Sequence, residues 1–369
     1  MDQSIKDIIR FMCVSLLVVV TAAALNFVVD PLQIFRPARL FAAMYSQESR
    51  LQDAGLIRSQ NFDAAFMGTS LAIQFRQSDI DRILGVKSLK LAMSGASSRE
   101  QVFVLAAALG RQPKRVIWEV DDWIFHDTPE IDANTHLPAD LYRGNARGIM
   151  GYLLSGAMAR ESAWIMARSI PQLQPSVARL TSDAVFKFAV SRVDDINALR
   201  PDEDAIFNAK RAMAAFNYVT DPLRSKYLKD DTDYETKVRV FERDAIGLIG
   251  ANPDVMFDIY LPPYSVLQWV ALRDTSPETL KSVYAFSAHF CRRLMDFPNV
   301  RLFDFRALSE VTHDLNNYSD VIHHSPAIDL KILSWLAEGK YRVDRSEPTA
   351  TLDQLISQVE AYRVDKVEH

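Results

Sequence analysis

Two short stretches, far apart in the sequence, carry side chains that together could perform nucleophilic catalysis. The first is an apolar run that stops at Gly68 and presents Ser70 on the turn that follows. A small residue two places before a serine allows a tight strand-to-helix turn, which lifts the hydroxyl off a sheet and points backbone N–H groups at the attacked group. The second stretch holds Asp320 and His323 just before a helix start. We therefore consider a serine nucleophile with a distant base.

The spacing of the second stretch suits a base and its orienting acid. A serine becomes a useful nucleophile when an imidazole takes its proton, and a carboxylate that fixes the ring tautomer improves that base. Asp320 and His323 are three residues apart in one expected loop, so they can make this contact locally. Ser70 would then meet His323 across the top of a sheet. His324 is a second candidate base, although the spacing favours His323, and the alternative is that both histidines pack beside the helix start.

Three further residues follow expected strands. The oxyanion that forms on an attacked ester needs hydrogen-bond donors, and the backbone N–H groups of Ser70 and Gly95 are the candidates. Glycine permits the backbone to approach a ligand closely. The other interpretation is that Gly95 only forms a turn. Asp121 and Tyr264 also follow strands, and ligands bind beyond the carboxyl ends of parallel strands. They are therefore our candidate substrate-binding residues.

Composition argues against several other functions. The formal net charge is −5 and no basic run occurs, so we expect no nucleic-acid partner. The two cysteines, Cys13 and Cys291, define neither a disulfide framework nor a Cys-x-x-Cys pair. A group of acidic and histidine residues lacks the spacing that places metal ligands on one helix face. Its members are His126, Asp127, Asp132 and His136. We expect no metal and no cofactor.

The elements that must position these residues alternate between strand and helix. Short apolar strands separated by helices imply a parallel sheet covered on both faces. A capping-box spacing, either of Ser97 with Glu100 or of Ser98 with Gln101, opens one helix. Pro326 begins another helix, which Gly339 ends. The fold class we expect is α/β, a three-layer α/β/α sandwich with about five strands. The expected strands are 62–67, 87–92, 115–120, 255–261 and 300–305.

The segment at 126–252 is far longer than one crossover helix requires, and several of its runs look helical. We interpret it as a helical insertion in a catalytic domain that covers 62–345. A connecting region at 31–61 precedes this domain. A polar tail at 346–369 follows it, with one amphipathic helix and then disorder.

Residues 11–29 are almost continuously apolar and match the ~20 residues that an α-helix needs to cross a bilayer. Lys6 and Arg10 precede this run and favour a cytoplasmic N-terminus. A cleaved signal peptide with its cleavage site at 22–24 is one alternative, and a buried core helix is another. Because the apolar run continues past 24, we favour a retained single-pass anchor in a bacterial inner membrane. The catalytic domain would then be periplasmic.

At this point the motifs resemble those of the SGNH (GDSL-type) hydrolase superfamily. The run Gly68-Thr69-Ser70 is similar to its first block, Gly95 to its second, and the Asp-x-x-His of Asp320 and His323 to its last. With the N-terminal anchor, the chain looks similar to the membrane-anchored proteins of polysaccharide and teichoic-acid acylation, the AlgJ/AlgX and DltD-like group.

The resemblance implies that Ser70 carries an acyl group and moves acetyl to or from a cell-surface glycan or exopolysaccharide. It also implies that a membrane-bound O-acyltransferase supplies the acetyl group. Two departures stand out: Thr69 replaces the usual aspartate, and 118–122 lacks the asparagine of the third block. These departures make a non-catalytic glycan-binding or assembly subunit one alternative. An esterase of the same mechanism, with water as acceptor, is another.

Overall fold

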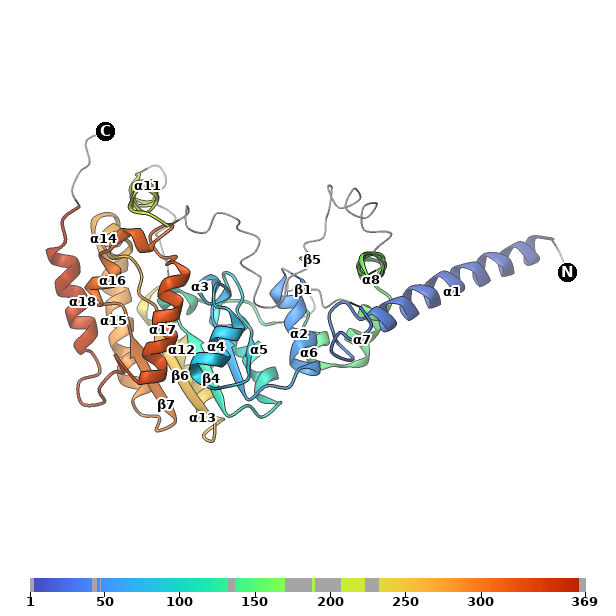
Figure 1. Cartoon of the computed structure of the whole chain (residues 1–369), viewed down its shortest axis with the longest axis horizontal. Coiled ribbons are helices and arrows are strands. Elements are labelled where there is room, and N and C mark those ends of the chain that lie inside the picture. Colours follow the sequence, from blue (N-terminus) through green and yellow to red (C-terminus); the bar gives the residue numbers. More distant parts are fainter. Residues whose placement is uncertain are drawn as a thin grey trace. The chain divides into compact units, whose positions relative to one another are not determined.

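The chain divides into two compact units, which Figure 1 shows in the colours of the sequence. The anchor unit comprises Met1–Asn61 and Ile131–Ile196, and the sheet unit comprises Phe62–Glu130 and Asn197–His369. The computed structural model describes residues 3–41, 45–46, 48–131, 137–169, 188–189, 207–222 and 232–364.

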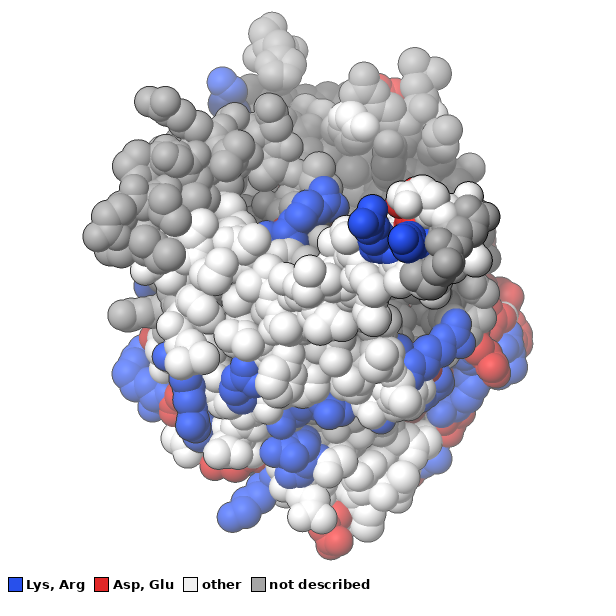
Figure 2. Space-filling view, turned by 90° about the vertical axis from the view of Figure 1, so that its right-hand side faces the viewer, with Lys and Arg blue, Asp and Glu red and all other residues white. Residues whose placement is uncertain are grey.

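The anchor unit begins with a long apolar helix, α1 (Gln3–Val29). Among the described residues it is the helix long and apolar enough to cross a membrane, with a mean hydropathy of 2.5 over its most apolar window. Most of its apolar side chains are exposed, which differs from a helix buried in a protein core. Figure 2 looks onto the right-hand side of Figure 1, where a broad uncharged surface lies among Lys and Arg side chains. The length and composition of α1 fit a membrane span and also a signal sequence.

The C-terminal end of α1 is bound to other parts of the anchor unit. Asn26 is fully buried, and its amide donates hydrogen bonds to the carbonyls of Tyr152, Leu153 and Ser155. The Asp30 carboxylate accepts hydrogen bonds from the Tyr152 hydroxyl and from three following backbone N–H groups. In this unit α1 packs against α7 (Ala146–Leu153) and α8 (Gly156–Arg168). The other described elements of the unit are α2 (Ser49–Ser59), α6 (Ala139–Arg143) and the antiparallel strands β1 (Tyr45–Ser46) and β5 (Phe188–Ala189).

This arrangement differs from the single insertion expected at 126–252. The described residues 137–169 fold with the connecting region, whereas the described residues 207–222 and 232–252 belong to the sheet unit. Sequence periodicity identified helices in the segment, but it carries no information on which body each helix packs against.

The sheet unit contains a five-stranded, fully parallel sheet, so the expected α/β class is confirmed. In the order β3-β2-β4-β6-β7, the chain first runs from β2 to β3 at one edge of the sheet. It then crosses to β4 on the other side of β2, so the winding reverses between β2 and β4. In such sheets the crevice at the carboxyl ends, where the winding reverses, is the usual ligand site. The strands are β2 (Ala64–Met67), β3 (Ser88–Lys90), β4 (Arg115–Glu119), β6 (Met256–Leu261) and β7 (Val300–Asp304).

Helices pack on both faces of this sheet. On one face, Phe66 and Ile117 share a core cluster with Ile80 and Ile332, which lie on α4 and α17. On the other face, the Trp118 indole donates a 2.7 Å hydrogen bond to Gln101 of α5. The helices of four or more residues are α3 (Ser70–Ile73), α4 (Gln77–Leu84), α5 (Ser98–Leu109), α11 (Ala209–Thr220), α12 (Tyr234–Phe241), α13 (Gly247–Gly250), α14 (Val266–Thr275), α15 (Pro277–Leu294), α16 (Ser309–Thr312), α17 (Pro326–Glu338) and α18 (Ala350–Ala361). Shorter or irregular turns are η1 (Asp122–Ile124), η5 (Glu242–Ile246) and η6 (Leu315–Asn317).

The amphipathic helix expected after 346 is present as α18 (Ala350–Ala361), but it belongs to the core of the sheet unit and not to a polar tail. Leu352, Leu355 and Val359 of α18 are buried and share a core cluster with Trp269 of α14. Their spacing of three and then four residues forms one apolar stripe, which is the usual pattern for a helix that packs against a domain. The folded unit therefore extends at least to residue 361.

Candidate active site

Ser70 is the first residue of α3, directly after the turn that leaves β2. Gly68 begins this turn, and it lies against the next strand, β4. A Cβ atom added to Gly68 would lie 2.7 Å from the Cβ of Glu119 and 2.6 Å from that of Ala72. No side chain fits in that space, so the turn requires glycine. The sequence signal of a small residue before the serine thus has a steric cause.

The structure brings Ser70, His323 and Asp320 together at the carboxyl end of the sheet. Ser70 Oγ is 2.9 Å from His323 Nε2, and His323 Nδ1 is 2.6 Å from Asp320 Oδ2. The second oxygen of Asp320 accepts hydrogen bonds from the backbone N–H groups of Ile322 and His323, at 2.8 and 2.7 Å. Because a carboxylate is only an acceptor, the ring proton lies on Nδ1, and Nε2 is left to accept the serine proton.

Hydrogen bonds keep Asp320 ionised. Burial works against its charge, but the hydrogen bonds from the His323 ring and backbone outweigh this effect and lower the pKa of the carboxyl. The side chains of Asp320 and His323 remain 36% and 27% exposed. A ligand can therefore approach this pair.

His324 takes a different position from its neighbour. It is fully buried, and its Nδ1 lies 3.1 Å from Asp329 Oδ1 on α17. The two groups are close but not aligned for a hydrogen bond, since neither ring nitrogen nor either carboxylate oxygen has such a partner among the described residues. His324 is thus paired with Asp329, and it is His323 that contacts Ser70.

A buried group of carboxyls supports the Ser70 turn from below. Thr69 donates through its backbone N–H to Glu119 Oε2 at 2.7 Å and through its hydroxyl to Asp121 Oδ2 at 2.6 Å. The Tyr264 hydroxyl donates to the other oxygen of Asp121. Both oxygens of Asp121 are therefore occupied by protein groups, and the residue is almost fully buried. This placement favours support of the turn over the direct substrate contact that we expected for Asp121.

Glu119 was not among the residues selected from the sequence. Burial raises its pKa well above the usual value, and the nearby charge of Asp121 raises it further. Burial also raises the pKa of Asp121, against the hydrogen bonds from Thr69 and Tyr264. The sequence signal was a glutamate after three apolar residues of the strand, and it does not reveal a partner.

Gly95 lies on the loop that follows β3, beside the Ser70 turn. Met93 of the same loop donates its backbone N–H to the carbonyl of Gly68 at 2.9 Å. Gly95 has φ +63 and is exposed, so its left-handed backbone favours glycine. Ser70 opens a helix, so its own N–H has no partner within that helix. Both N–H groups remain candidate oxyanion donors.

A cavity of about 850 Å³ adjoins the loop that carries Asp320 and His323. Val321 and Ile322, which lie between these two residues, form part of its wall, and Tyr264 lines it as well. Within the described part of the chain, no group of three His, Cys, Asp or Glu side chains is placed to hold a metal ion. Asp132 and His136 lie outside the described residues.

A scan against protein-family models found no match to the chain, and a search of curated proteins found none either. The resemblance noted in the sequence therefore rests on three short motifs, at 68–70, at 95 and at 320–323. The contacts among Ser70, His323 and Asp320 add a geometric observation that is independent of those motifs.

Proposed function

We propose that the protein is a serine-dependent acyltransferase that moves an acyl group, such as acetyl, to or from a glycan outside the cytoplasm. In this proposal Ser70 is the nucleophile, His323 the general base and Asp320 the group that orients the ring. One observation carries it: the continuous line of contacts from Ser70 Oγ through both nitrogens of His323 to the Asp320 carboxylate. The SGNH-like three-layer fold is part of the same proposal, and the parallel sheet order supports it.

In the first half of the reaction, Ser70 Oγ attacks the carbonyl carbon of an ester while its proton passes to His323 Nε2. The new C–O bond converts the carbonyl oxygen to an oxyanion, which the N–H groups of Ser70 and Gly95 would stabilise. The bond to the leaving alcohol then breaks, and that alcohol leaves with the proton from His323. The product is an acyl-serine.

In the second half, an acceptor hydroxyl attacks the acyl-serine and gives its proton to His323. The acyl group leaves Ser70, which recovers the proton from the imidazolium. A sugar hydroxyl as acceptor gives transfer, and water gives hydrolysis. Asp320 stabilises the imidazolium in both halves through its contact with Nδ1.

The N-terminal helix supports the membrane part of the proposal. A span formed by the apolar part of α1, with Lys6 and Arg10 in the first turns of the same helix, would hold the sheet unit outside the cytoplasm. In that position the acetyl donor would come from a membrane-bound O-acyltransferase, as the resemblance implies, and the acceptor would be a surface glycan or exopolysaccharide.

The test is ester hydrolysis by the full-length protein in detergent, with 4-nitrophenyl acetate as substrate. We expect a rate that Ser70→Ala lowers by about 10³-fold, because the nucleophile is lost while the fold remains. In cells, the same variant should lose acetylation of the polymer. Unchanged polymer acetylation with Ser70→Ala would contradict the proposal and favour a non-catalytic subunit.

Transfer and hydrolysis are separated by following a labelled acetyl group. The label should appear on an added oligosaccharide if the protein is a transferase. Appearance only as acetate, across a range of acceptors, would favour the esterase.

A further inference from the structure

The cavity beside the candidate triad has walls from several elements of the sheet unit. Val321 and Ile322 connect it to the loop of Asp320 and His323, and Tyr264 connects it to the network under Ser70. Its volume of about 850 Å³ falls within the usual range for small-molecule sites. An acetyl group, which has only a methyl and a carbonyl, would fill a small part of it.

The described walls combine aromatic and aliphatic side chains with uncharged polar groups. Trp123 is the partly exposed ring, whereas Trp269 and Tyr264 are 2% and 5% exposed. Gln268 and Thr279 supply an amide and a hydroxyl, and the aliphatic residues are Val219, Leu272, Val283, Val321 and Ile322. A pyranose ring has apolar C–H faces that pack on aromatic faces, and its hydroxyls need hydrogen-bond partners around the ring. A purely aliphatic chain would remove water from Gln268 and Thr279 without replacing its hydrogen bonds.

Among the described lining residues, the carboxylates are the charged groups. Asp122, Asp127 and Asp233 line the cavity, and none of the described lining residues is Lys or Arg. The guanidinium groups that balance two of these carboxylates are not part of the lining. Arg306 contacts Asp122 at 3.2 Å, and Arg239 contacts Asp127 at 2.7 Å.

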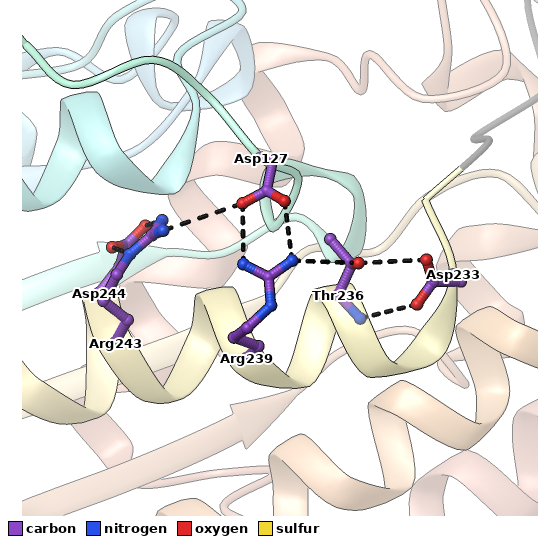
Figure 3. Close-up of polar contacts among 6 residues, drawn as sticks. All are labelled: Asp127, Asp233, Thr236, Arg239, Arg243 and Asp244. Atoms are coloured by element: carbon purple, nitrogen blue, oxygen red, sulfur yellow. Dashed lines mark hydrogen bonds and ion pairs between the residues drawn. The ribbon is translucent and has the colours of Figure 1, made fainter.

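Figure 3 shows the second of these contacts, between Arg239 and Asp127. Arg239, on α12, donates to both oxygens of Asp127 and also to the Thr236 hydroxyl. Asp233 caps the same helix through the Thr236 backbone N–H, at 2.8 Å. These carboxylates are engaged by protein donors, but each oxygen keeps a lone pair that can accept from a ligand hydroxyl. An anionic ligand would find no cationic partner among the described lining residues.

From these observations we infer that the cavity binds an uncharged oligosaccharide segment and discriminates against polyanionic glycans such as polyuronates or phosphate-bearing polymers. The inference rests on the proposed function for the role of this glycan as acyl acceptor or acyl carrier. The binding itself does not depend on the chemistry at Ser70.

The experiment measures binding to the full-length Ser70→Ala variant, purified in a detergent without a sugar headgroup. Intrinsic tryptophan fluorescence is the readout, because Trp123 and Trp269 line the cavity. The neutral probes are cellotetraose, maltotetraose and chitotetraose, and the anionic probe is tetragalacturonate. We expect a saturable change with at least one neutral probe and at least about tenfold weaker binding of the anionic probe, because like charges oppose each other in the cavity.

Gln268→Lys sharpens the test by placing a cation in the cavity wall. We expect it to weaken binding of the neutral probe and to strengthen binding of tetragalacturonate. Gln112→Lys is the matched control, because Gln112 is exposed and does not line the cavity, and it should leave both affinities unchanged.

Equal or tighter binding of tetragalacturonate by the parent protein would overturn the inference, and so would the absence of any saturable change with the neutral probes. The esterase assay distinguishes this failure from failure of the proposed function. Ser70-dependent hydrolysis without glycan binding would refute the cavity assignment alone. Glycan binding without such hydrolysis would keep the cavity assignment and refute the acyl-transfer chemistry.

Discussion

Two adjacent histidines each lie beside an aspartate, but one pair is partly exposed and the other is buried. His323 lies 2.6 Å from Asp320, is partly exposed and contacts Ser70. His324 lies 3.1 Å from Asp329, is fully buried and is not aligned with that carboxylate for a hydrogen bond. The same two residue types therefore form two pairs with different access to solvent and to a nucleophile.

The backbone explains why neighbours differ so much. His324 forms an antiparallel bridge with Tyr318, and the Ser319 N–H donates to the carbonyl of His323. In such extended backbone, successive side chains point to opposite sides. One ring therefore turns toward Ser70 and the other toward α17. Solvent access and contact with a nucleophile distinguish a candidate base from a core histidine, whereas the residue type alone does not.

The largest expected effect is the loss of activity when His323 is replaced. His323→Ala should lower kcat for 4-nitrophenyl acetate by about 10³-fold, because the serine loses its base. Thermal unfolding should change little, since the side chain is partly exposed. Activity close to that of the parent protein would remove His323 from the mechanism.

The matched substitution at the neighbouring histidine should affect stability. His324→Ala leaves the buried Asp329 without its partner, which we expect to cost about 3 kcal/mol in the free energy of unfolding. Denaturant titration measures this cost, and kcat per folded molecule should remain within about twofold of the parent value. A large loss of kcat in folded protein would show that the two pairs are not functionally distinct.

Asp320→Asn should lower kcat by about 10²-fold, a smaller effect than loss of the base. The amide would present N–H to the ring and favour the wrong tautomer, but the pair is partly exposed and water can compensate in part. Asp329→Asn is the matched control and should leave kcat unchanged. Equal effects of the two substitutions on kcat would contradict the assignment.

The smallest effect concerns how stability depends on pH. Burial raises the pKa of Asp329 above its ordinary value of 3.8, so the folded state binds this proton more tightly than the unfolded state does. Stability therefore falls as pH rises from about 3.8 through the raised pKa, by up to about 1.4 kcal/mol per pH unit. Asp329→Asn should remove this fall.

The pKa of Asp320 is shifted in the opposite direction, so its effect on the pH dependence of stability has the opposite sign. Its pKa is lowered, so its stabilisation is present above the ordinary value and is lost as pH falls through the lowered value. Unfolding free energies of both asparagine variants, measured from acid to neutral pH, test the contrast. Parallel profiles for the two variants would show that the environments do not differ as described.

Much of the fold was predictable because local patterns determined it. The capping box at Ser97 and the left-handed Gly339 that ends α17 both occur as expected. Each depends on contacts within a few residues. The division of 126–252 between two units was not predictable, since it depends on contacts between distant segments.

The same distinction applies to the site. The Asp320 and His323 contact spans three residues, so spacing alone indicated it, and Gly68 pointed to the turn that presents Ser70. Glu119 was missed because its relevance depends on Thr69, which is 50 residues away. Local spacing identifies groups that act within one loop, whereas a supporting group from a neighbouring strand becomes visible only in the folded structure.

The contact between Gly68 and Glu119 has a consequence for how related sequences can vary. A side chain at 68 would occupy the space that the Cβ atoms of Glu119 and Ala72 now fill, so on this backbone position 68 could enlarge only if both of those residues lost their Cβ. Over evolutionary time position 68 should therefore remain glycine. An alignment of homologues in which bulky residues at 68 coexist with glutamate at 119 would mean that the backbone of that turn can adopt a second path.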